Sequence, residues 1–250
     1  MGNLSGKVSI ITGAGSGIGR QTALTFAQNG AKVVVAEVNE ANGQETVQQI
    51  EDAGGEATFF KVDVSKYDEV EAMVDFAVRE YGTLDVLFNN AGVSHVANVL
   101  DEDIEDYHKL ISVDQHGVFY GIKAGADKMK ELGVRGVIVN TASTFAFLAY
   151  PSNITYNMAK AAVVQATKTA AADLAPHGIR VVGVAPATIN TDILKEYPAE
   201  ALEAIKVKHM RNDVIEPERV ADVVAFLASD AADAINGSVI PVDDGYLSFK

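Results

Sequence analysis

The sequence predicts an α/β protein with a single doubly wound parallel β-sheet of about seven strands and helices on both faces. Short runs rich in β-branched residues alternate with longer amphipathic runs along all 250 residues. Several of the short runs are apolar throughout, as strands covered on both faces must be. A strand followed by a helix, repeated about six times, indicates parallel strands joined by right-handed crossovers.

The predicted strands share a short length and a high content of valine and isoleucine. In chain order they are KVSIIT (7–12), KVVVAE (32–37), ATFFKVD (57–63), LDVLFN (84–89), GVIVNT (136–141), IRVVGVA (179–185) and SVIPVD (238–243). Helices are expected between them. QTALTFAQNG should end at Gly30 as its C-cap, and EVEAMVDFAVREYG at Gly82. No linker, low-complexity segment or repeat divides the chain, so residues 1–250 are predicted to form one domain.

The composition limits the classes of function. The formal net charge is −14, and an acidic chain repels nucleic acid and anionic lipid. No run approaches 18 apolar residues, so no membrane span is expected. The absence of cysteine fits a cytoplasmic protein. No metal site is predicted. Apart from His95, the histidines are His108, His116, His177 and His209, and their spacing is not that of metal ligands.

A glycine-rich turn, TGAGSGIG (12–19), separates the first predicted strand from the first helix. Backbone N–H groups and the helix dipole point there at whatever lies above the strand end, and glycine lets a phosphate approach the main chain. The spacing does not fit G-x-G-x-x-G, and it lacks the ending of a P-loop. A tight loop without a ligand is the alternative. The expected cofactor contacts are Gly13, Ser16, Gly17, Ile18 and Gly19.

Glu37 ends the second predicted strand, where a dinucleotide-binding fold places an acid on the adenine ribose. A carboxylate there accepts hydrogen bonds from the ribose hydroxyls and repels a 2′-phosphate. Ser16 stands in the glycine turn where an arginine could bind that phosphate, and Val38 and Asn39 follow Glu37. The sequence therefore favours NAD (NADH) over NADP. The alternative is a solvated glutamate at a strand end.

Tyr156 and Lys160, in YNMAK, are four residues apart and share one face of a helix. At ~4 Å and an effective dielectric of ~20, an ammonium attracts a phenolate by roughly 4 kcal/mol. Tyrosine is ordinarily a poor base at neutral pH, and this attraction suits it to general acid–base work. A surface Tyr/Lys pair without chemistry is the alternative that this spacing leaves open.

Four motifs occur in one order and at one set of spacings: TGAGSGIG, NNAG at 89–92, Ser143 and YNMAK. Together they resemble the classical short-chain dehydrogenase/reductase (SDR) family, from about Lys7 to about Tyr246. The resemblance implies a Rossmann-type sheet and an NAD-dependent alcohol dehydrogenase or carbonyl reductase. It also implies that the hydride belongs to the cofactor chemistry while the protein supplies orientation and proton transfer.

The resemblance assigns roles to individual residues. Tyr156 would pass a proton to or from the substrate oxygen. Lys160 would stabilise the phenolate form of Tyr156 and donate a hydrogen bond to the nicotinamide ribose. Ser143 would hold the substrate oxygen. The further cofactor contacts would be Asp63 and Val64 near the adenine, Asn90, Ala91 and Gly92 after the fourth strand, and Pro186, Ile189 and Thr191 in PATINT.

Two positions depart from the family pattern. Asp114, in SVDQHGVF, stands where the family has an asparagine that helps seat a water in a proton relay reaching the lysine. We include Asp114 among the catalytic residues because its main-chain carbonyl can still help to seat the water of that relay. Its charge should favour the ammonium of Lys160 but weaken the pull on the phenolate, so we expect activity with a raised pH optimum for alcohol oxidation. Ala187 replaces the glycine after Pro186, with no definite effect assigned.

The substrate pocket is predicted from three segments that should meet near the nicotinamide. Their side chains suggest a small or medium hydrophobic ketone or secondary alcohol. Core or subunit-interface positions explain the same aromatic residues equally well. The predicted pocket residues are Ser94 and His95 after NNAG, Phe145 and Tyr150 in TFAFLAYPSN, and Ile193, Leu194 and Tyr197 in an internal lid of about residues 188–212.

Two other functions stay open. A 3-oxoacyl carrier-protein reductase of the same family would use NADPH and dock an acidic carrier protein, and both Glu37 and the net charge argue against it. A non-catalytic cofactor-binding regulator is opposed by the intact Ser143, Tyr156 and Lys160.

Two further expectations concern helices. Family analogy implies a homotetramer, with the alanine-rich helix after Tyr156 available for packing between subunits. The run DEDIED (101–106) should be the solvated start of the long helix that carries Asp114.

Overall fold

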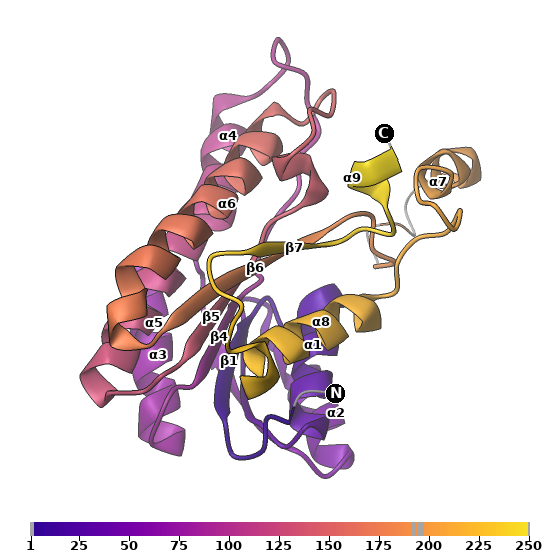
Figure 1. The fold of residues 1–250 in the computed structure, drawn as a ribbon. Helices are drawn as coiled ribbons and strands as arrows, with labels where there is room; N and C mark the ends of the chain where they lie inside the picture. Colours follow the sequence, from indigo (N-terminus) through magenta and orange to yellow (C-terminus); the bar gives the residue numbers. More distant parts are fainter. Residues whose placement is uncertain (1–2, 192–193, 195–197, 250) are drawn as a thin grey trace.

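Seven parallel strands form one sheet in the order β3-β2-β1-β4-β5-β6-β7, which confirms the predicted fold class (Figure 1). The computed structural model describes residues 3–191, 194 and 198–249. Each predicted strand is present, with boundaries that differ by at most two residues. The strands are β1 (Val8–Thr12), β2 (Lys32–Glu37), β3 (Glu56–Lys61), β4 (Val86–Asn89), β5 (Val137–Thr141), β6 (Arg180–Pro186) and β7 (Val239–Val242).

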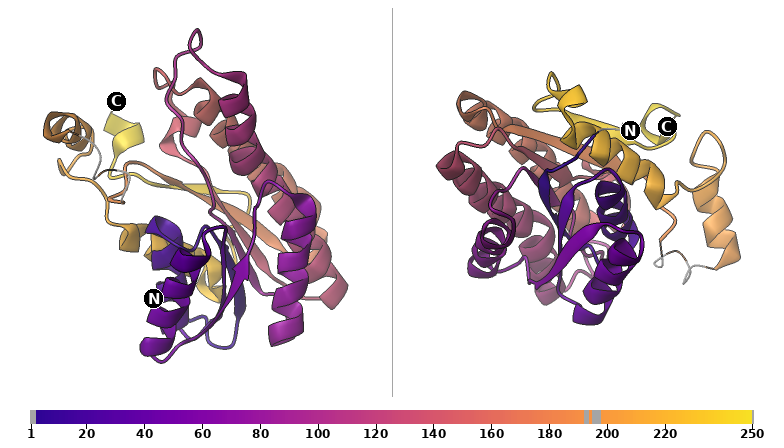
Figure 2. Two further views of the ribbon diagram at one scale, coloured as in Figure 1. Left: turned by 180° about the vertical axis from the view of Figure 1, so that it is seen from behind. Right: turned by 90° about the horizontal axis from the view of Figure 1, so that it is seen from below.

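Helices cover both faces of the sheet, as the three views show (Figures 1 and 2). One face carries α1 (Gly17–Gln28), α2 (Glu40–Asp52) and α8 (Pro217–Ala228). The opposite face carries α3 (Tyr67–Tyr81), α4 (Ile104–Ile111), the π-helical turn η1 (Ser112–His116), α5 (Gly117–Leu132) and α6 (Ile154–Leu174). The shorter helices are η2 (Thr144–Ala146), η3 (Ala175–His177), α7 (Ala199–Lys206), η5 (Asp230–Ala232) and α9 (Tyr246–Phe249).

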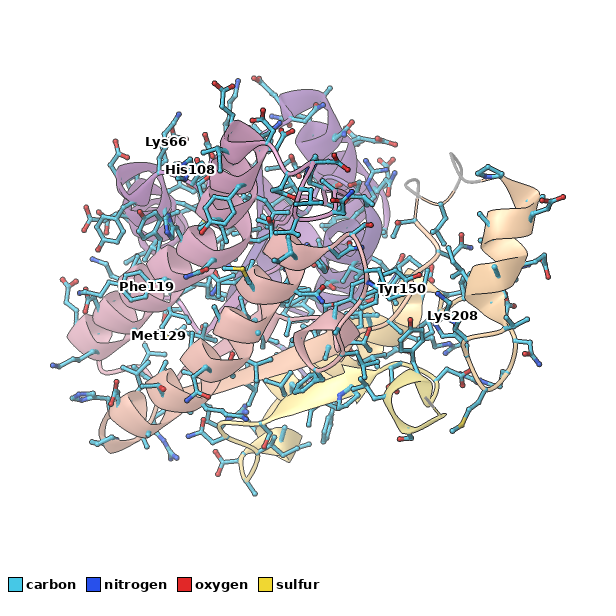
Figure 3. All side chains as sticks on the ribbon, turned by 90° about the horizontal axis from the view of Figure 1, so that it is seen from above. Lys66, His108, Phe119, Met129, Tyr150 and Lys208 are labelled. Atoms are coloured by element: carbon cyan, nitrogen blue, oxygen red, sulfur yellow. The ribbon has the colours of Figure 1, made fainter. Side chains whose placement is uncertain are left out.

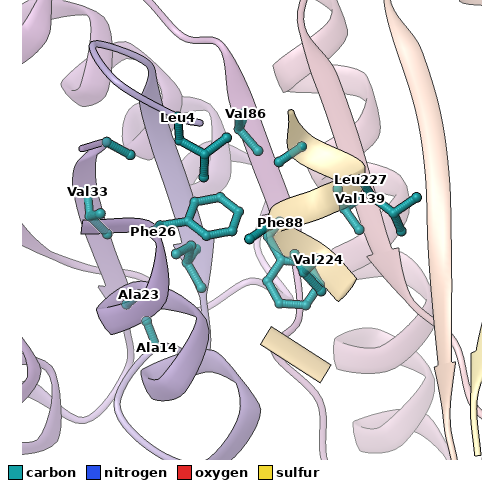
Figure 4. Packing of buried hydrophobic residues seen from close by; sticks show 14 of the residues in the cluster. Leu4, Ala14, Ala23, Phe26, Val33, Val86, Phe88, Val139, Val224 and Leu227 are labelled. Carbon is teal, nitrogen blue, oxygen red and sulfur yellow. The ribbon is translucent and has the colours of Figure 1, made fainter. Parts of the chain in front are cut away.

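Two hydrophobic clusters separate the layers because successive strand residues point to opposite faces. Val33 and Val35 of β2 belong to the cluster under α1, α2 and α8, whereas Val34 belongs to the cluster under α3 and α5. Phe26 and Phe88 lie at the centre of the first cluster and are fully buried (Figure 4). Several strands are therefore apolar throughout because helices pack on both faces of the sheet.

Helix ends follow the sequence in part. Gly82 caps α3 with a left-handed φ of 86°, as predicted. For α1 the capping residue is Asn29 rather than Gly30, and Gly30 takes the left-handed conformation one position later (φ 86°). This is the position that left-handed glycine prefers after a helix.

The acidic run DEDIED is only partly a solvated helix start. Asp103 is the N-cap of α4 and accepts a hydrogen bond from the backbone N–H of Glu105 (2.7 Å). Glu102 precedes the helix, is largely buried, and accepts a hydrogen bond from the Thr155 hydroxyl (2.8 Å). The expected long helix is divided by the five-residue π turn that contains Asp114. None of the described helices has the length and hydropathy needed to span a membrane.

Candidate active site

A cleft of about 1060 Å³ opens at the carboxyl ends of the strands. The segments that follow β1 and β4 leave the sheet toward opposite faces, and such a switch point is where doubly wound sheets bind ligands. Residues from the ends of β1 to β6 line this cleft, so a single cavity collects segments that are far apart in the sequence.

The glycine turn packs directly on the segment after β4. The Thr12 hydroxyl accepts hydrogen bonds from the backbone N–H groups of Asn90 (2.9 Å) and Ala91 (3.0 Å). Gly13 has φ +64°, and a Cβ there would lie 2.8 Å from the Cα of Ala91. A Cβ on Gly19 would lie 2.1 Å from the Gly13 carbonyl oxygen. Only glycine fits these two positions, and the resulting turn presents the N-terminus of α1 to the cleft.

Glu37 lies at the end of β2 with its carboxylate turned toward the glycine turn. It accepts hydrogen bonds from the backbone N–H groups of Gly15 (3.1 Å), Val38 (2.9 Å) and Asn39 (3.0 Å). The nearby guanidinium of Arg20 donates to Glu45 (2.7 Å) on α2. This end of the cleft therefore presents a carboxylate, and the Arg20 guanidinium is engaged by Glu45.

Asp63 lies after β3 and lines the same end of the cleft. Burial tends to raise the pKa of its carboxyl, but two hydrogen bonds from Ser65 and the charge of Lys66 outweigh burial, and the net pKa is lowered. Asp63 is thus held as a carboxylate.

Tyr156, Lys160 and Ser143 converge on the middle of the cleft. The first two lie on the N-terminal turns of α6, with the Lys160 Nζ 5.5 Å from the centroid of the Tyr156 ring. Ser143 follows β5 and is buried, and its Oγ accepts a hydrogen bond from the backbone N–H of Phe145 (3.2 Å). The Lys160 ammonium donates to the Thr141 carbonyl (3.1 Å).

Asp114 forms a buried ion pair with Lys160. Its Oδ2 lies 3.1 Å from the Lys160 Nζ, and the two side chains are only 1% and 4% exposed. Its Oδ1 accepts a hydrogen bond from the Val93 backbone N–H (2.7 Å), and a Cβ on Gly92 would lie 3.0 Å from Oδ2. Burial tends to lower the pKa of Lys160, but the electrostatic interactions with Asp114 and Tyr156 and the hydrogen bond to Asp114 together outweigh burial, and the net pKa is raised. Lys160 is therefore held as an ammonium.

The predicted substrate pocket divides into residues inside and outside the cleft. Ser94, Phe145, Tyr150 and Leu194 line it. His95 is not among the lining residues; its Nε2 lies 4.0 Å and 3.9 Å from carboxylates of Glu102 and Asp106. Ile193 and Tyr197 fall outside the described residues, and the described part of the predicted lid contains α7.

Comparisons with known proteins identify the family of this chain. Residues 13–247 match the family described as Enoyl-(Acyl carrier protein) reductase. A short-chain type dehydrogenase/reductase from Mycobacterium marinum has a crystal structure that superposes with a TM-score of 0.93, at 35% identity over 98% of this chain and 96% of that one. The chain belongs to the short-chain dehydrogenase/reductase family. It is therefore an oxidoreductase of a family that binds a nicotinamide cofactor, and it acts on a small molecule.

Two SDR relatives show the range of activities around this chain. Cyclohexanol dehydrogenase of Acinetobacter sp. (strain SE19) is 40% identical, covering 97% of this chain and 95% of the relative. The 3-oxoacyl-[acyl-carrier-protein] reductase FabG of Thermotoga maritima is 36% identical, covering 97% and 98%. Both are reductases or dehydrogenases of carbonyl or hydroxyl groups by name, and they leave this SDR's own substrate and choice of cofactor open.

The residues of the cleft fit a dinucleotide. Gly13 lets the turn lie directly against Ala91, where a Cβ would be 2.8 Å from the Ala91 Cα, and Gly17 (φ +51°) brings the turn close to Thr191. All the predicted cofactor contacts line the cleft except Gly19, which packs α1 against the turn instead. In chain order the lining contacts are Gly13, Ser16, Gly17, Ile18, Glu37, Asp63, Val64, Asn90, Ala91, Gly92, Tyr156, Lys160, Pro186, Ile189 and Thr191.

Several residues of this SDR site were missed by sequence reasoning. Thr12 holds the segment after β4 through its hydroxyl, and its position directly before Gly13 is a signal that could have been used. Asn89, Asn140 and Thr167 form a buried hydrogen-bond chain beneath the site (2.9 Å and 3.0 Å). No periodicity marks such partners, because they lie on β4, β5 and α6. Lys208 also lines the cleft, and nothing local in the sequence predicts it.

Proposed function

We propose that this SDR interconverts a secondary alcohol and a ketone with NAD(H), using Tyr156 as the acid/base. The observation that carries the proposal is the convergence of Tyr156, Ser143 and the buried Lys160 on the cleft that begins at the glycine turn and Glu37. Binding site and proton-transfer groups thus share one cavity.

The cofactor would lie along the glycine turn with its adenine end near Asp63. The carboxylate of Glu37 supports NAD over NADP, since it would accept hydrogen bonds from ribose hydroxyls and repel a 2′-phosphate. When bound, the nicotinamide supplies or accepts the hydride. Thr191 and Ile189 line the cleft where they would orient that ring.

The chain's own residues would handle the proton. In ketone reduction the Tyr156 hydroxyl gives its proton to the substrate oxygen, and in alcohol oxidation the phenolate takes it back. The Ser143 hydroxyl donates a hydrogen bond to the same oxygen. The Lys160 ammonium stabilises the phenolate, and the Asp114 carboxylate acts on the reaction through Lys160.

Asp114 gives the proposal a kinetic signature. Its carboxylate partly neutralises the lysine charge that the phenolate feels, so alcohol oxidation should have its optimum at a raised pH. In Asp114→Asn the optimum should move to lower pH, because the full ammonium charge then acts on the phenolate. An unchanged pH–rate profile of kcat/KM in Asp114→Asn would remove Asp114 from this role.

The apolar lining supports a small or medium hydrophobic substrate. Phe145, Tyr150, Leu194 and Ile205 line the cleft. A compact secondary alcohol on an aliphatic ring, the group that cyclohexanol dehydrogenase of Acinetobacter is named for, is our first choice. A 3-oxoacyl carrier-protein reductase using NADPH is the second candidate, because FabG of Thermotoga maritima is 36% identical. The acidic charge of the chain speaks against a docked carrier protein.

The deciding experiment compares oxidation of NADH and NADPH against a panel of cyclic ketones, diketones, sugars and an acetoacetyl thioester. We expect turnover of a cyclic ketone with NADH. Tyr156→Phe should lower kcat by about 10²–10⁴, the range for a lost general acid. Tyr107→Phe, a tyrosine on α4 that does not line the cleft, is the matched control. A preference for NADPH with the thioester would favour the carrier-protein reductase, and binding of NADH without any turnover would favour a regulator.

A homotetramer and a cytoplasmic location complete the proposal. The support for the tetramer is the family resemblance together with exposed Phe119 and Met158 on α5 and α6. Light scattering after size exclusion should give four chains of 26.5 kDa. A monomer at micromolar concentration would contradict it.

A further inference from the structure

One end of the cleft carries a lysine that pairs with no acid in the described part of the chain. Lys208 follows α7, is half-buried and lines the cleft. Within the described residues, no carboxylate oxygen lies within 4.0 Å of its Nζ. The chain has 34 acidic and 20 basic residues, so a half-buried cation without such a partner is unexpected on electrostatic grounds alone.

The Lys208 ammonium is held by Tyr150. Its Nζ donates a hydrogen bond to the Tyr150 hydroxyl (2.6 Å) and lies 4.6 Å from the centroid of that ring. Figure 3 shows the two side chains meeting from separate segments of the chain. An ammonium has three N–H donors, and a hydroxyl that accepts a hydrogen bond can still donate its own hydrogen. The pair therefore keeps donors on both side chains for an acceptor in the cleft.

An aromatic wall connects this pair with the acid/base. The Tyr150 ring stacks on Phe145 at 4.5 Å between centroids and 12° between planes. Phe145 in turn meets Tyr156 edge to face at 6.2 Å. A substrate whose reacting oxygen lies at Tyr156 and Ser143 would extend its apolar body along Phe145 toward Lys208.

Among the described residues, the other charged side chains that line the cleft lie at the cofactor end, are paired with each other, or are exposed. Glu37 and Asp63 follow β2 and β3 at the cofactor end, and Asp114 pairs with Lys160. Lys109 is exposed on α4. In the part of the chain that the structure describes, the substrate end is thus lined by the Lys208 ammonium and apolar surface, where a charge-assisted hydrogen bond is strong.

We propose that the substrate is a hydroxy acid or oxo acid whose carboxylate binds between Lys208 and Tyr150, at the end of the molecule distant from the reacting carbon. The inference rests on the proposed function, because it names the class of substrate for that same site. A lysine that only fastens the segment after α7 to the aromatic wall is the competing explanation.

The test uses charged and neutral substrates of the same shape. The acids are 4-oxocyclohexanecarboxylate and 4-acetylbenzoate, which differ in reach, and each is compared with its primary amide. At least one acid should exceed its amide in kcat/KM by about tenfold or more, the size expected for hydrogen bonds to a charged group. Lys208→Met should abolish that preference mainly through KM, and Lys208→Arg should keep most of it.

Lys206→Met is the matched control for the segment. It removes a charge from α7 that pairs with Glu203 (3.0 Å) and does not line the cleft, so the preference for the acid should survive. The inference is overturned if the unmodified protein treats both acids like their amides, or if Lys208→Met lowers acid and amide turnover equally, as a purely structural lysine would.

Direct binding separates this inference from the proposed function. Calorimetry with cyclohexanecarboxylate and cyclohexanecarboxamide needs no turnover. Tighter binding of the carboxylate, lost in Lys208→Met, would support the anion site even if no ketone of the panel were reduced. Equal binding of the two ligands would overturn it even if ketone reduction with NADH succeeded.

Discussion

The two ends of the cleft are assembled in different ways. The cofactor end is made of strand ends and main chain that touch one another, as where the glycine turn lies against Ala91 and the Thr12 hydroxyl takes two backbone N–H groups. The substrate end is made of side chains from separate loops, such as Tyr150 and Lys208, which are 58 residues apart. Main-chain contact leaves little freedom for substitution, whereas side-chain contact across loops leaves much more.

The largest loss of stability is expected from substitution of Asp114. Asp114→Ala should cost about 3–5 kcal/mol in the free energy of unfolding, because it leaves the buried Lys160 ammonium without its partner. Asp114→Asn should cost less, since an amide oxygen can still accept from the Val93 N–H. Denaturant unfolding of both variants measures the difference. An alanine variant whose free energy of unfolding lies within about 0.5 kcal/mol of the parent's would show that the ion pair does not stabilise the fold.

The next effect is expected in the glycine turn. Gly19→Ala should cost about 1–3 kcal/mol and weaken NADH binding, because the added methyl meets the Gly13 carbonyl at 2.1 Å. Gly54→Ala is the control: its φ is +80° but no atom lies within 4 Å, so only a strain of about 1 kcal/mol is expected, with unchanged NADH binding. If both variants bind NADH as tightly as the parent, NADH binding does not depend on the close packing of the glycine turn.

Alkaline pH should weaken the ion pair between Asp114 and Lys160. The pKa of Lys160 is raised in the folded state, so its ion pair contributes stability that is complete below the ordinary value of 10.5 and lost as pH rises through the folded pKa. The stability difference between the parent and Asp114→Asn should stay constant from about pH 7 to 10 and shrink above that range. Unfolding curves at a series of pH values check this. A difference that shrinks already near pH 8 would contradict it.

The smallest effect is expected at the substrate end. Tyr150→Phe removes the hydroxyl that accepts from the partly exposed Lys208, so the free energy of unfolding should change by less than about 0.5 kcal/mol. Thermal unfolding followed by circular dichroism measures it. A loss comparable with that of Gly19→Ala would make the two ends alike in rigidity and undo the contrast.

The same contrast explains which parts of the fold and of the site the sequence predicts. The strands and the glycine turn could be predicted because their signals are local: apolar runs, and glycines where a side chain would collide with the main chain. Asp114 and Lys160 could be placed near each other only through the family resemblance, since they lie on different helices.

Side chains on loops carried no such signal. His95 was predicted to line the pocket from its place after NNAG, but its ring faces Glu102 and Asp106 instead. Glu102 was predicted to be solvated, but Thr155, 53 residues away, donates to it. Lys208 was not singled out, because its partner Tyr150 lies in another segment and the pairing depends on the fold.

The π turn between α4 and α5 sets a limit on insertions and deletions. Each residue added to or removed from a helix rotates the remainder of that helix by about 100°. The turn Ser112–His116 already contains the wider spacing that directs Asp114 to Lys160. Loss of one residue would restore an ordinary helix and rotate Asp114 away from the lysine or all of α5 away from the sheet. Residues 112–116 should therefore accept many substitutions on their exposed side, but no change in length.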